Sequence, residues 1–310
     1  MGEAPVQRPI VRSTKEEFMD LSGVGVWSTH LRYGDQAESA DAAAELEDLG
    51  FRALWIPDAG GPVFDTAGRL LTATRQTIVA TGVLNLWMHD PADAAAGHAT
   101  LSAAHGDRFL MGIGVSHPSR VETAGSGPYG KPLATMAAFL DDLDRTTRPV
   151  PAETRVLAAL GPKMIETAAK RARGIHTYLV TPTHTRRARQ ALGEGPLVIP
   201  EQTVILTSNA DEARAIGTEW LRRYLALPSY AYNLVRLGFL HEDLEKVSDR
   251  LFDALIAWGD EEAIKRRVDE HHAAGADHVC VQVLTADPSA FPRQQWRRLA
   301  PALCSTARRP

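Results

Sequence analysis

Short apolar runs alternate with helix-like stretches along most of this chain. Gly23 to Ser28 predicts a strand, Ser39 to Leu49 predicts a helix rich in alanine and glutamate, and Phe51 to Asp58 predicts the next strand. Six further strands are predicted at Ile78 to Leu86, Phe109 to Val115, Thr154 to Leu160, His176 to Thr181, Thr203 to Thr207 and Ala276 to Leu284. Because these runs are apolar almost throughout, they are typical of parallel strands buried on both faces.

Nearly every predicted strand is followed by a predicted helix, which favours one closed barrel. Four of these helices begin at or next to a proline, whose missing N–H costs nothing in the first turn. These prolines are Pro91, Pro132, Pro162 and Pro182. The pattern predicts an α/β fold, a (β/α)₈ TIM-type barrel over residues 23–303, with an N-terminal arm at 1–22 and a C-terminal tail at 304–310.

One interval is far longer than a single crossover helix. Ser208 to Gly275 separates predicted strands seven and eight, and we expect it to hold a helical insertion over residues 226–258.

A doubly wound open sheet is the structural alternative. Such sheets carry a G-x-G-x-x-G fingerprint where the first strand turns into a helix. Gly23-Val-Gly25 breaks this pattern at Ser28, and Gly112-Ile-Gly114 breaks it at His117. The absence of an intact fingerprint favours the barrel.

The composition is that of an ordinary globular protein, at 44% hydrophobic and 23% charged residues. A formal net charge of −4 gives no basic field for a nucleic-acid backbone or an anionic membrane, so we expect a small-molecule substrate as the partner. Cys280 and Cys304 supply neither a disulfide framework nor a paired-cysteine zinc site, which favours a reducing, cytoplasmic location. The chain start lacks the order of a signal peptide, and no apolar run has the length of a membrane span.

In a barrel enzyme, the working residues follow the carboxyl ends of the strands. Asp58 follows strand two, where it could orient a ring nitrogen or a proton-transfer partner, or simply form a turn. His117 lies between a glycine-rich strand end and Pro118, and the ordinary pKa of histidine suits proton transfer near neutral pH. A loop histidine bonded to the backbone is the alternative interpretation.

Three other features carry weaker signals. Ala159 to Lys163 ends a strand and starts a helix, so its N–H groups could bind a phosphate or merely form a turn. The glycine-rich loop Ala124 to Pro132 could close over a ligand or only span a gap. His271, His272 and His278 make a poor metal set, because adjacent residues on a helix face different directions, and we expect no metal site.

The strand ends together resemble those of the luciferase-like monooxygenase superfamily, in particular its branch of oxidoreductases dependent on the deazaflavin coenzyme F420. The resemblance is ordered along residues 23–303. It rests on the Gly-Val-Leu at the end of strand three and on RFLMGIGVSHP (Arg108 to Pro118), YGKP (Tyr129 to Pro132), ALGPKM (Ala159 to Met164), YLVTP (Tyr178 to Pro182) and AGADHVCVQVL (Ala274 to Leu284).

This resemblance implies a TIM-type barrel with an insertion after strand seven and a cofactor ring in the barrel mouth. It also implies a non-proline cis peptide at Gly82-Val83 against the ring, and commonly a homodimer. The implied cofactor-binding residues are Asp58, Gly82, Val83, Asn85, Gly114, Val115, Ser116, His117, Ala159, Leu160, Gly161 and Thr181. The implied reaction is hydride transfer to or from the deazaflavin, with the protein supplying orientation and a proton.

One departure from the family pattern bears on catalysis. Sugar-phosphate dehydrogenases of this family carry a histidine directly after the strand-two aspartate, where this chain has Ala59 followed by two glycines. Those relatives have an acidic residue at the position of His117. Our hypothesis is that His117 takes over proton transfer, with Asp58 as the second catalytic residue, and that the substrate is not a sugar phosphate.

Four functions follow as candidates. The first is an F420-dependent oxidoreductase acting on an unknown small organic substrate, and the second is an FMN-dependent monooxygenase of the same fold. The third is a non-catalytic protein that binds a flavin or deazaflavin, which the missing histidine makes a real alternative. An isomerase or aldolase on a generic barrel lacks the expected lysine or metal ligands.

Overall fold

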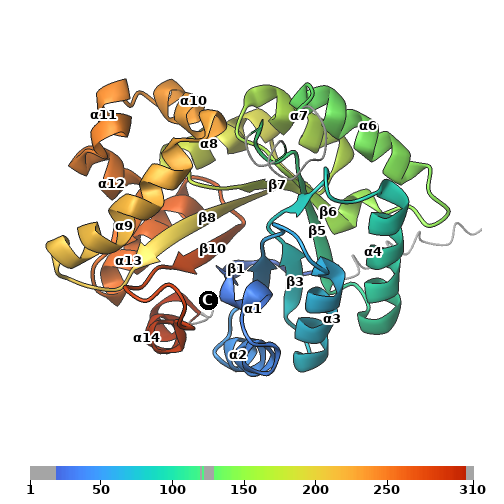
Figure 1. Cartoon of the computed structure of the whole chain (residues 1–310), viewed down its shortest axis with the longest axis horizontal. Helices are drawn as coiled ribbons and strands as arrows, with labels where there is room; N and C mark the ends of the chain where they lie inside the picture. Colours follow the sequence, from blue (N-terminus) through green and yellow to red (C-terminus); the bar gives the residue numbers. More distant parts are fainter. Residues whose placement is uncertain (1–18, 119–120, 122–128, 305–310) are drawn as a thin grey trace, which may run out of the picture.

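In the computed structural model, eight parallel strands close into a barrel (Figure 1). The structure describes residues 19–118, 121 and 129–304. The sheet runs in the order β10-β1-β2-β3-β5-β6-β7-β8, and β8 also pairs with β10, which closes the ring. The barrel strands are β1 (Gly23–Trp27), β2 (Ala53–Ile56), β3 (Ile78–Thr81), β5 (Phe109–Gly114), β6 (Arg155–Ala158), β7 (Gly174–Thr177), β8 (Leu197–Ile205) and β10 (His278–Val283). The predicted (β/α)₈ barrel is confirmed, and the open doubly wound sheet is excluded.

Helices surround the barrel between successive strands. They are α1 (His30–Tyr33), α2 (Gln36–Asp48), α3 (Val63–Ala73), α4 (Pro91–His105), α6 (Pro132–Asp144), α7 (Pro162–Arg171), α8 (Pro182–Leu192), α13 (Glu261–Ala273) and α14 (Arg293–Leu303), with a short 3-10 turn, η1 (Ala152–Thr154), before β6. The four predicted proline starts are all found in the first turn of their helices. The two-residue strand β4 (Leu84–Asn85) follows β3 and pairs with β5.

Two strands differ from their predicted positions. The sixth barrel strand is Gly174–Thr177, and Leu179 beyond it has a positive φ of 55°, which ends the extended backbone. The seventh begins at Leu197, before its predicted start at Thr203. The sequence pattern does not predict the first half of this strand, because its apolar run is interrupted by Pro200, Glu201 and Gln202.

The interval between β8 and β10 folds as a group of helices on one side of the barrel (Figure 1). Before α13 it contains α9 (Ala210–Leu225), α10 (Pro228–Arg236), α11 (His241–Lys246) and α12 (Asp249–Leu255). Ile256–Trp258, expected to belong to the helical insertion, is instead a short strand, β9, parallel to β8. A separate apolar cluster, including Leu221, Leu234 and Phe252, holds these helices together. The predicted helical insertion is present and has its own small core.

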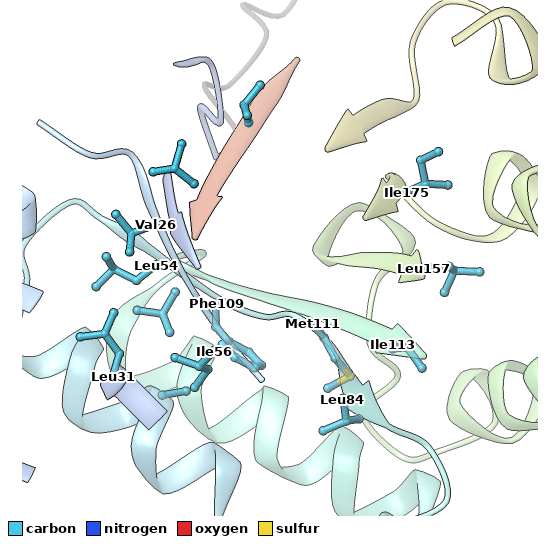
Figure 2. Packing of buried hydrophobic residues seen from close by; sticks show 14 of the residues in the cluster. Val26, Leu31, Leu54, Ile56, Leu84, Phe109, Met111, Ile113, Leu157 and Ile175 are labelled. Carbon is cyan, nitrogen blue, oxygen red and sulfur yellow. The ribbon is translucent and has the colours of Figure 1, made fainter. Parts of the chain in front are cut away.

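The two faces of the barrel strands pack against different partners. Outward-facing side chains such as Leu54, Ile56 and Met111 meet the helix layer in the main core (Figure 2). Inward-facing side chains, among them Trp55, Leu110 and Ile199, fill the barrel interior. Burial of each such side chain stabilises the fold by about 1.5–3 kcal/mol.

The barrel interior contains neutral polar rings as well as apolar side chains. Trp55 stacks on His176 with ring centroids 4.6 Å apart, and its Nε1 donates to Nε2 of His278 at 3.2 Å. His278 Nδ1 donates in turn to the carbonyl of Leu21 at 2.8 Å. A Cβ on Gly25 would lie 2.5 Å from the His278 ring, so a glycine is required there. Met19 and Leu21 of the expected arm help to fill the barrel. Residues 1–18 and 305–310 of the expected arm and tail lie outside the described residues.

Candidate active site

The predicted site residues follow five strands that end at the same rim of the barrel. Asp58 follows β2, Asn85 ends β4, and His117 follows β5. Gly161 and Thr181 are the N-caps of α7 and α8, after β6 and β7. The closed parallel topology therefore brings all the predicted strand ends to one mouth.

The peptide bond Gly82-Val83 lies in this mouth and is cis, as the family resemblance implies. Trp27 at the end of β1 donates from Nε1 to the carbonyl of Gly82 at 2.9 Å. On the other side, a Cβ on Gly114 would lie 2.4 Å from Cγ2 of Val83. Gly114 thus makes room for Val83, and Trp27 fixes the carbonyl of Gly82.

Asp58 is fully engaged with neighbouring protein groups. Its side chain is 0% exposed, and Oδ2 accepts from the backbone N–H of Asn85 at 3.1 Å and lies 2.8 Å from Nε2 of His89. Because a carboxylate oxygen only accepts hydrogen bonds, Nε2 of His89 is the donor. Oδ1 of Asp58 accepts from the N–H of Gly60 at 3.3 Å, the contact expected of a turn former.

His89 places a histidine beside the strand-two aspartate from another part of the chain. It comes from the loop after β4, and its side chain is 15% exposed against the ring of Phe64, with centroids 5.9 Å apart. At the position where some relatives carry a histidine, the N–H of Ala59 donates instead to the hydroxyl of Tyr33 at 2.7 Å. The aspartate–histidine pair is therefore present, although the residues are not adjacent in sequence.

His117 contacts the insertion. Its Nδ1 lies 3.0 Å from Oγ of Ser229, and its ring lies 5.1 Å from that of Tyr230, both at the start of α10. The preceding Ser116 has a positive φ of 57°, and its carbonyl accepts from the hydroxyl of Tyr129 at 3.3 Å. The remaining residues of the glycine-rich loop before Tyr129, 124–128, lie outside the described residues. The side chain of His117 thus contacts a side chain of the insertion, Ser229. Its role in proton transfer stays a prediction.

A run of aromatic rings crosses the mouth from β1 to His117. The ring centroids of Trp27 and Tyr178 lie 5.3 Å apart, and those of Tyr178 and Tyr230 lie 6.1 Å apart. The ring of Tyr230 in turn contacts that of His117. Tyr178 is half-buried, and desolvation raises the pKa of its hydroxyl well above the usual range. Tyr178 therefore stays protonated, and its hydroxyl donates to Oε1 of Gln282 at 2.6 Å.

The predicted phosphate-binding turn lies under α10. A Cβ on Gly161 would lie 3.3 Å from the guanidinium of Arg236, which donates to Oδ1 of Asn233 at 3.1 Å. The Nδ2 of Asn233 is buried and has no partner among the described residues. Thr181 instead caps α8, accepting from the N–H of His184 at 3.3 Å.

A cavity of about 290 Å³ opens between the ends of β1 and β10 and helix α9. Its lining residues include Trp27, Gln282, Trp220 and Arg223. None of the predicted cofactor residues lines it, but Trp27 belongs both to the cavity wall and to the hydrogen bond with Gly82. The mouth thus has two adjoining parts, the strand ends with the predicted cofactor residues and this cavity, and the two parts meet at Trp27.

The sequence of the chain matches the family model of the luciferase-like monooxygenases over residues 18–278. The chain belongs to the luciferase-like monooxygenase family. Family membership places it among enzymes of the oxidoreductase class, and the resemblance inferred from the strand ends is confirmed.

Three similar proteins are informative. A Mycobacterium tuberculosis protein described as a coenzyme F420-dependent oxidoreductase is 29% identical over 103 residues, a stretch that spans 33% of this chain and only 30% of the relative. The coenzyme F420-dependent tetrahydromethanopterin reductase of Methanopyrus kandleri superposes with a TM-score of 0.70 at 15% identity, covering 91% of this chain and 98% of that one. The oxygenating constituent of 3,6-diketocamphane monooxygenase from Pseudomonas putida, solved with FMN, superposes with a TM-score of 0.64 at 13% identity, covering 91% and 98%. The two structures share the fold of this luciferase-like chain.

Several residues of this luciferase-like mouth were missed by sequence reasoning. His89 stands in His-Asp-Pro just before a predicted helix, which was the available signal. Trp27 ends the first strand, and a residue at the carboxyl end of a barrel strand is also a candidate site residue. The contributions of α9 and α10, such as Arg223 and Ser229, had no signal, because only the folded insertion brings these helices over the barrel.

The described ranges offer neither a metal site nor a membrane span. Within residues 19–118, 121 and 129–304, no group of three or more histidine, cysteine, aspartate or glutamate side chains could hold a metal ion. In the same part of the chain, no helix is both long and apolar enough to cross a membrane.

Proposed function

We propose that this chain is an oxidoreductase that transfers a hydride between coenzyme F420 and a small organic substrate. The observation that carries the proposal is the mouth itself, where a cavity of about 290 Å³ adjoins the end of β3 through the hydrogen bond from Trp27 to the carbonyl of Gly82. Family membership and the Mycobacterium tuberculosis relative described as F420-dependent support this choice of cofactor.

The turn at Gly161 suits the phosphate of such a cofactor. The N-terminus of α7 offers backbone N–H groups and the positive end of the helix dipole. Arg236 adds a positive charge above Gly161, and the unpartnered Nδ2 of Asn233 is a spare donor beside it. We propose that Gly161, Asn233 and Arg236 hold the phosphate, while Val83 and Gly114 lie against the ring.

The chain's own residues would provide orientation and a proton. The bound deazaflavin supplies a carbon that accepts or donates a hydride. Trp27 holds the Gly82 carbonyl, and Asp58 joins the ends of β2 and β4. His117, oriented by Ser229, is our proposed proton-transfer residue. Because the Asp58 carboxylate is enclosed by protein donors, we propose a positioning role for it.

Titration of the purified chain with F420 and with FMN, followed by fluorescence, tests the cofactor. We expect F420 to bind at least tenfold more tightly than FMN. Tighter FMN binding together with oxygen consumption would instead support the monooxygenase alternative. F420 binding with no turnover over a broad substrate panel would support the non-catalytic alternative.

Replacement of His117 tests proton transfer. His117→Ala should still bind F420, and it should lower kcat by about 10²–10⁴-fold, the usual contribution of a general acid or base. Ser229→Ala should lower kcat less, because it removes only the orienting hydroxyl. Normal turnover by His117→Ala would exclude the role. A homodimer and a cytoplasmic location remain further proposals.

A further inference from the structure

The cavity between β1, β10 and α9 has the chemistry of a specific binding site. Aromatic side chains form much of its wall. They are Trp27, Trp220, Tyr224 and Trp296. A volume of about 290 Å³ is at the small end of small-molecule sites, which run from roughly 300 to 1,000 Å³. Flat rings with an apolar face suit a flat apolar ligand of one or two fused rings.

Several side chains of the cavity wall have hydrogen-bond donors that other protein groups leave free. Oε1 of Gln282 accepts from the Tyr178 hydroxyl, which leaves Nε2 as its donor group, and Nε2 has no partner among the described residues. Oγ of Ser28 accepts from the N–H of His30 at 3.1 Å, so its own proton is left to donate. Trp296 has a buried Nε1–H with no acceptor in the described part of the chain. The cavity wall therefore offers donors and calls for a ligand with acceptors.

The charge at the cavity is positive. Arg223 lines it, and no aspartate or glutamate does among the described residues. Arg223 forms no ion pair within the described ranges, whereas its neighbour Arg222 pairs with Glu219 at 3.3 Å. The imidazole of His30 donates from Nε2 to the carbonyl of Pro288 at 3.0 Å, and burial lowers its pKa, so it adds no charge near neutral pH. An arginine without a carboxylate partner is suited to a carboxylate of the ligand.

We propose that this cavity binds the substrate and that the substrate is a flat aromatic carboxylate. The aromatic wall holds the ring system, and Arg223 with Gln282 binds the acid group. The cavity adjoins the proposed cofactor site through Trp27, which places the ligand beside the ring of the cofactor. The identification of the ligand as the substrate rests on the proposed function. Binding of the ligand to the cavity can be measured without turnover.

Isothermal titration calorimetry without cofactor tests the binding. The probes are naphthalene-2-carboxylate and its neutral counterpart, 2-naphthamide. We expect the carboxylate to bind at least tenfold more tightly than the amide. In Arg223→Gln this preference should disappear, with amide binding unchanged. Arg222→Gln, on the same helix but outside the cavity wall, is the matched control and should keep the full preference.

A second variant tests the aromatic wall. Trp220→Leu should weaken both probes at least fivefold. Equal binding of acid and amide by the unmodified chain would overturn the proposal, and so would equal behaviour of the Arg223 and Arg222 variants. Unfolding curves of every variant identify a folding defect. F420 titrations show separately whether the cofactor proposal fails, so neither outcome is mistaken for a failure of the substrate-site proposal.

Discussion

At the scale of single residues, Asp58 and His89 change the meaning of a missing histidine. The resemblance to the sugar-phosphate dehydrogenases of this family implies a histidine directly after Asp58, where this chain has Ala59. The structure supplies His89 from the loop after β4 and bonds it to Asp58 at 2.8 Å. Asp58 also accepts from the N–H of Asn85, so one carboxylate joins two strand ends. Its role in the fold is thereby defined by three hydrogen bonds from protein groups.

Removing the Asp58 carboxylate should destabilise the chain. Asp58→Ala leaves the N–H of Asn85 and the His89 ring without their acceptor, which costs about 1–3 kcal/mol for a buried donor. Denaturant unfolding measures this loss. Asp65→Asn, an exposed aspartate in the first turn of α3, is the control and should change stability far less. Equal stability of Asp58→Ala and the unmodified chain would show that the pair contributes nothing.

At the scale of elements, strand β8 is polar on both faces. Glu201 points toward the buried Thr203 hydroxyl, which lies 2.6 Å from Oε1, and burial raises the pKa of the Glu201 carboxyl to about 8. On the neighbouring position, Gln202 Oε1 lies 3.1 Å from the ring of His271, whose Nδ1 meets the Thr185 hydroxyl at 2.8 Å. These polar contacts link β8 to α8 and α13, and they explain why an apolar pattern did not reveal the start of this strand.

Glu201→Gln should stabilise the chain increasingly as the pH rises. In the folded chain Glu201 keeps its proton up to pH 8, whereas in the unfolded chain it loses it above about pH 4.5. Ionisation of the unfolded state therefore lowers the unfolding free energy by at most about 1.4 kcal/mol per pH unit over this window. The glutamine cannot ionise, so its advantage should grow from pH 5 to pH 8 in unfolding experiments. Glu194→Gln, exposed just before β8, is the control and should show no such trend.

At the scale of the whole molecule, the closed barrel buries several uncharged histidines. Burial lowers the pKa of His176 to about 4 and the pKa values of His271 and His278 to about 3. In the unfolded chain these rings take up protons below about pH 6.5. The stability that depends on the neutral rings is therefore complete above pH 6.5 and is lost as the pH falls toward 3 to 4.

The chain should thus be most stable near pH 6 to 7, with losses on both sides. We expect the unfolding free energy to be on the order of 2–4 kcal/mol lower at pH 5 than at pH 6.5. Each of the three rings contributes up to about 1.4 kcal/mol per pH unit to this loss, and the weaker ionisation of Glu201 in the unfolded chain at pH 5 offsets part of it. Guanidinium unfolding across this range measures the slope. His271→Gln, which cannot take up a proton, should reduce the slope, and the exposed His241→Gln should leave it unchanged. An identical slope in both variants would contradict the assignment.

The amino-acid sequence alone determined the alternation of strands and helices, and with it the barrel and the rim that carries the site. Apolar runs and prolines at helix starts are local signals. The prediction from the prolines is confirmed at Pro91, Pro162 and Pro182, each of which lies in the first turn of a helix. Only the tertiary structure decided which distant groups meet. The pairing of His89 with Asp58, the contact of Ser229 with His117 and the placing of Arg223 over the cavity depend on how the loop after β4 and the insertion pack. Such contacts join residues far apart in the chain, so no local pattern of hydrophobic and polar positions records them.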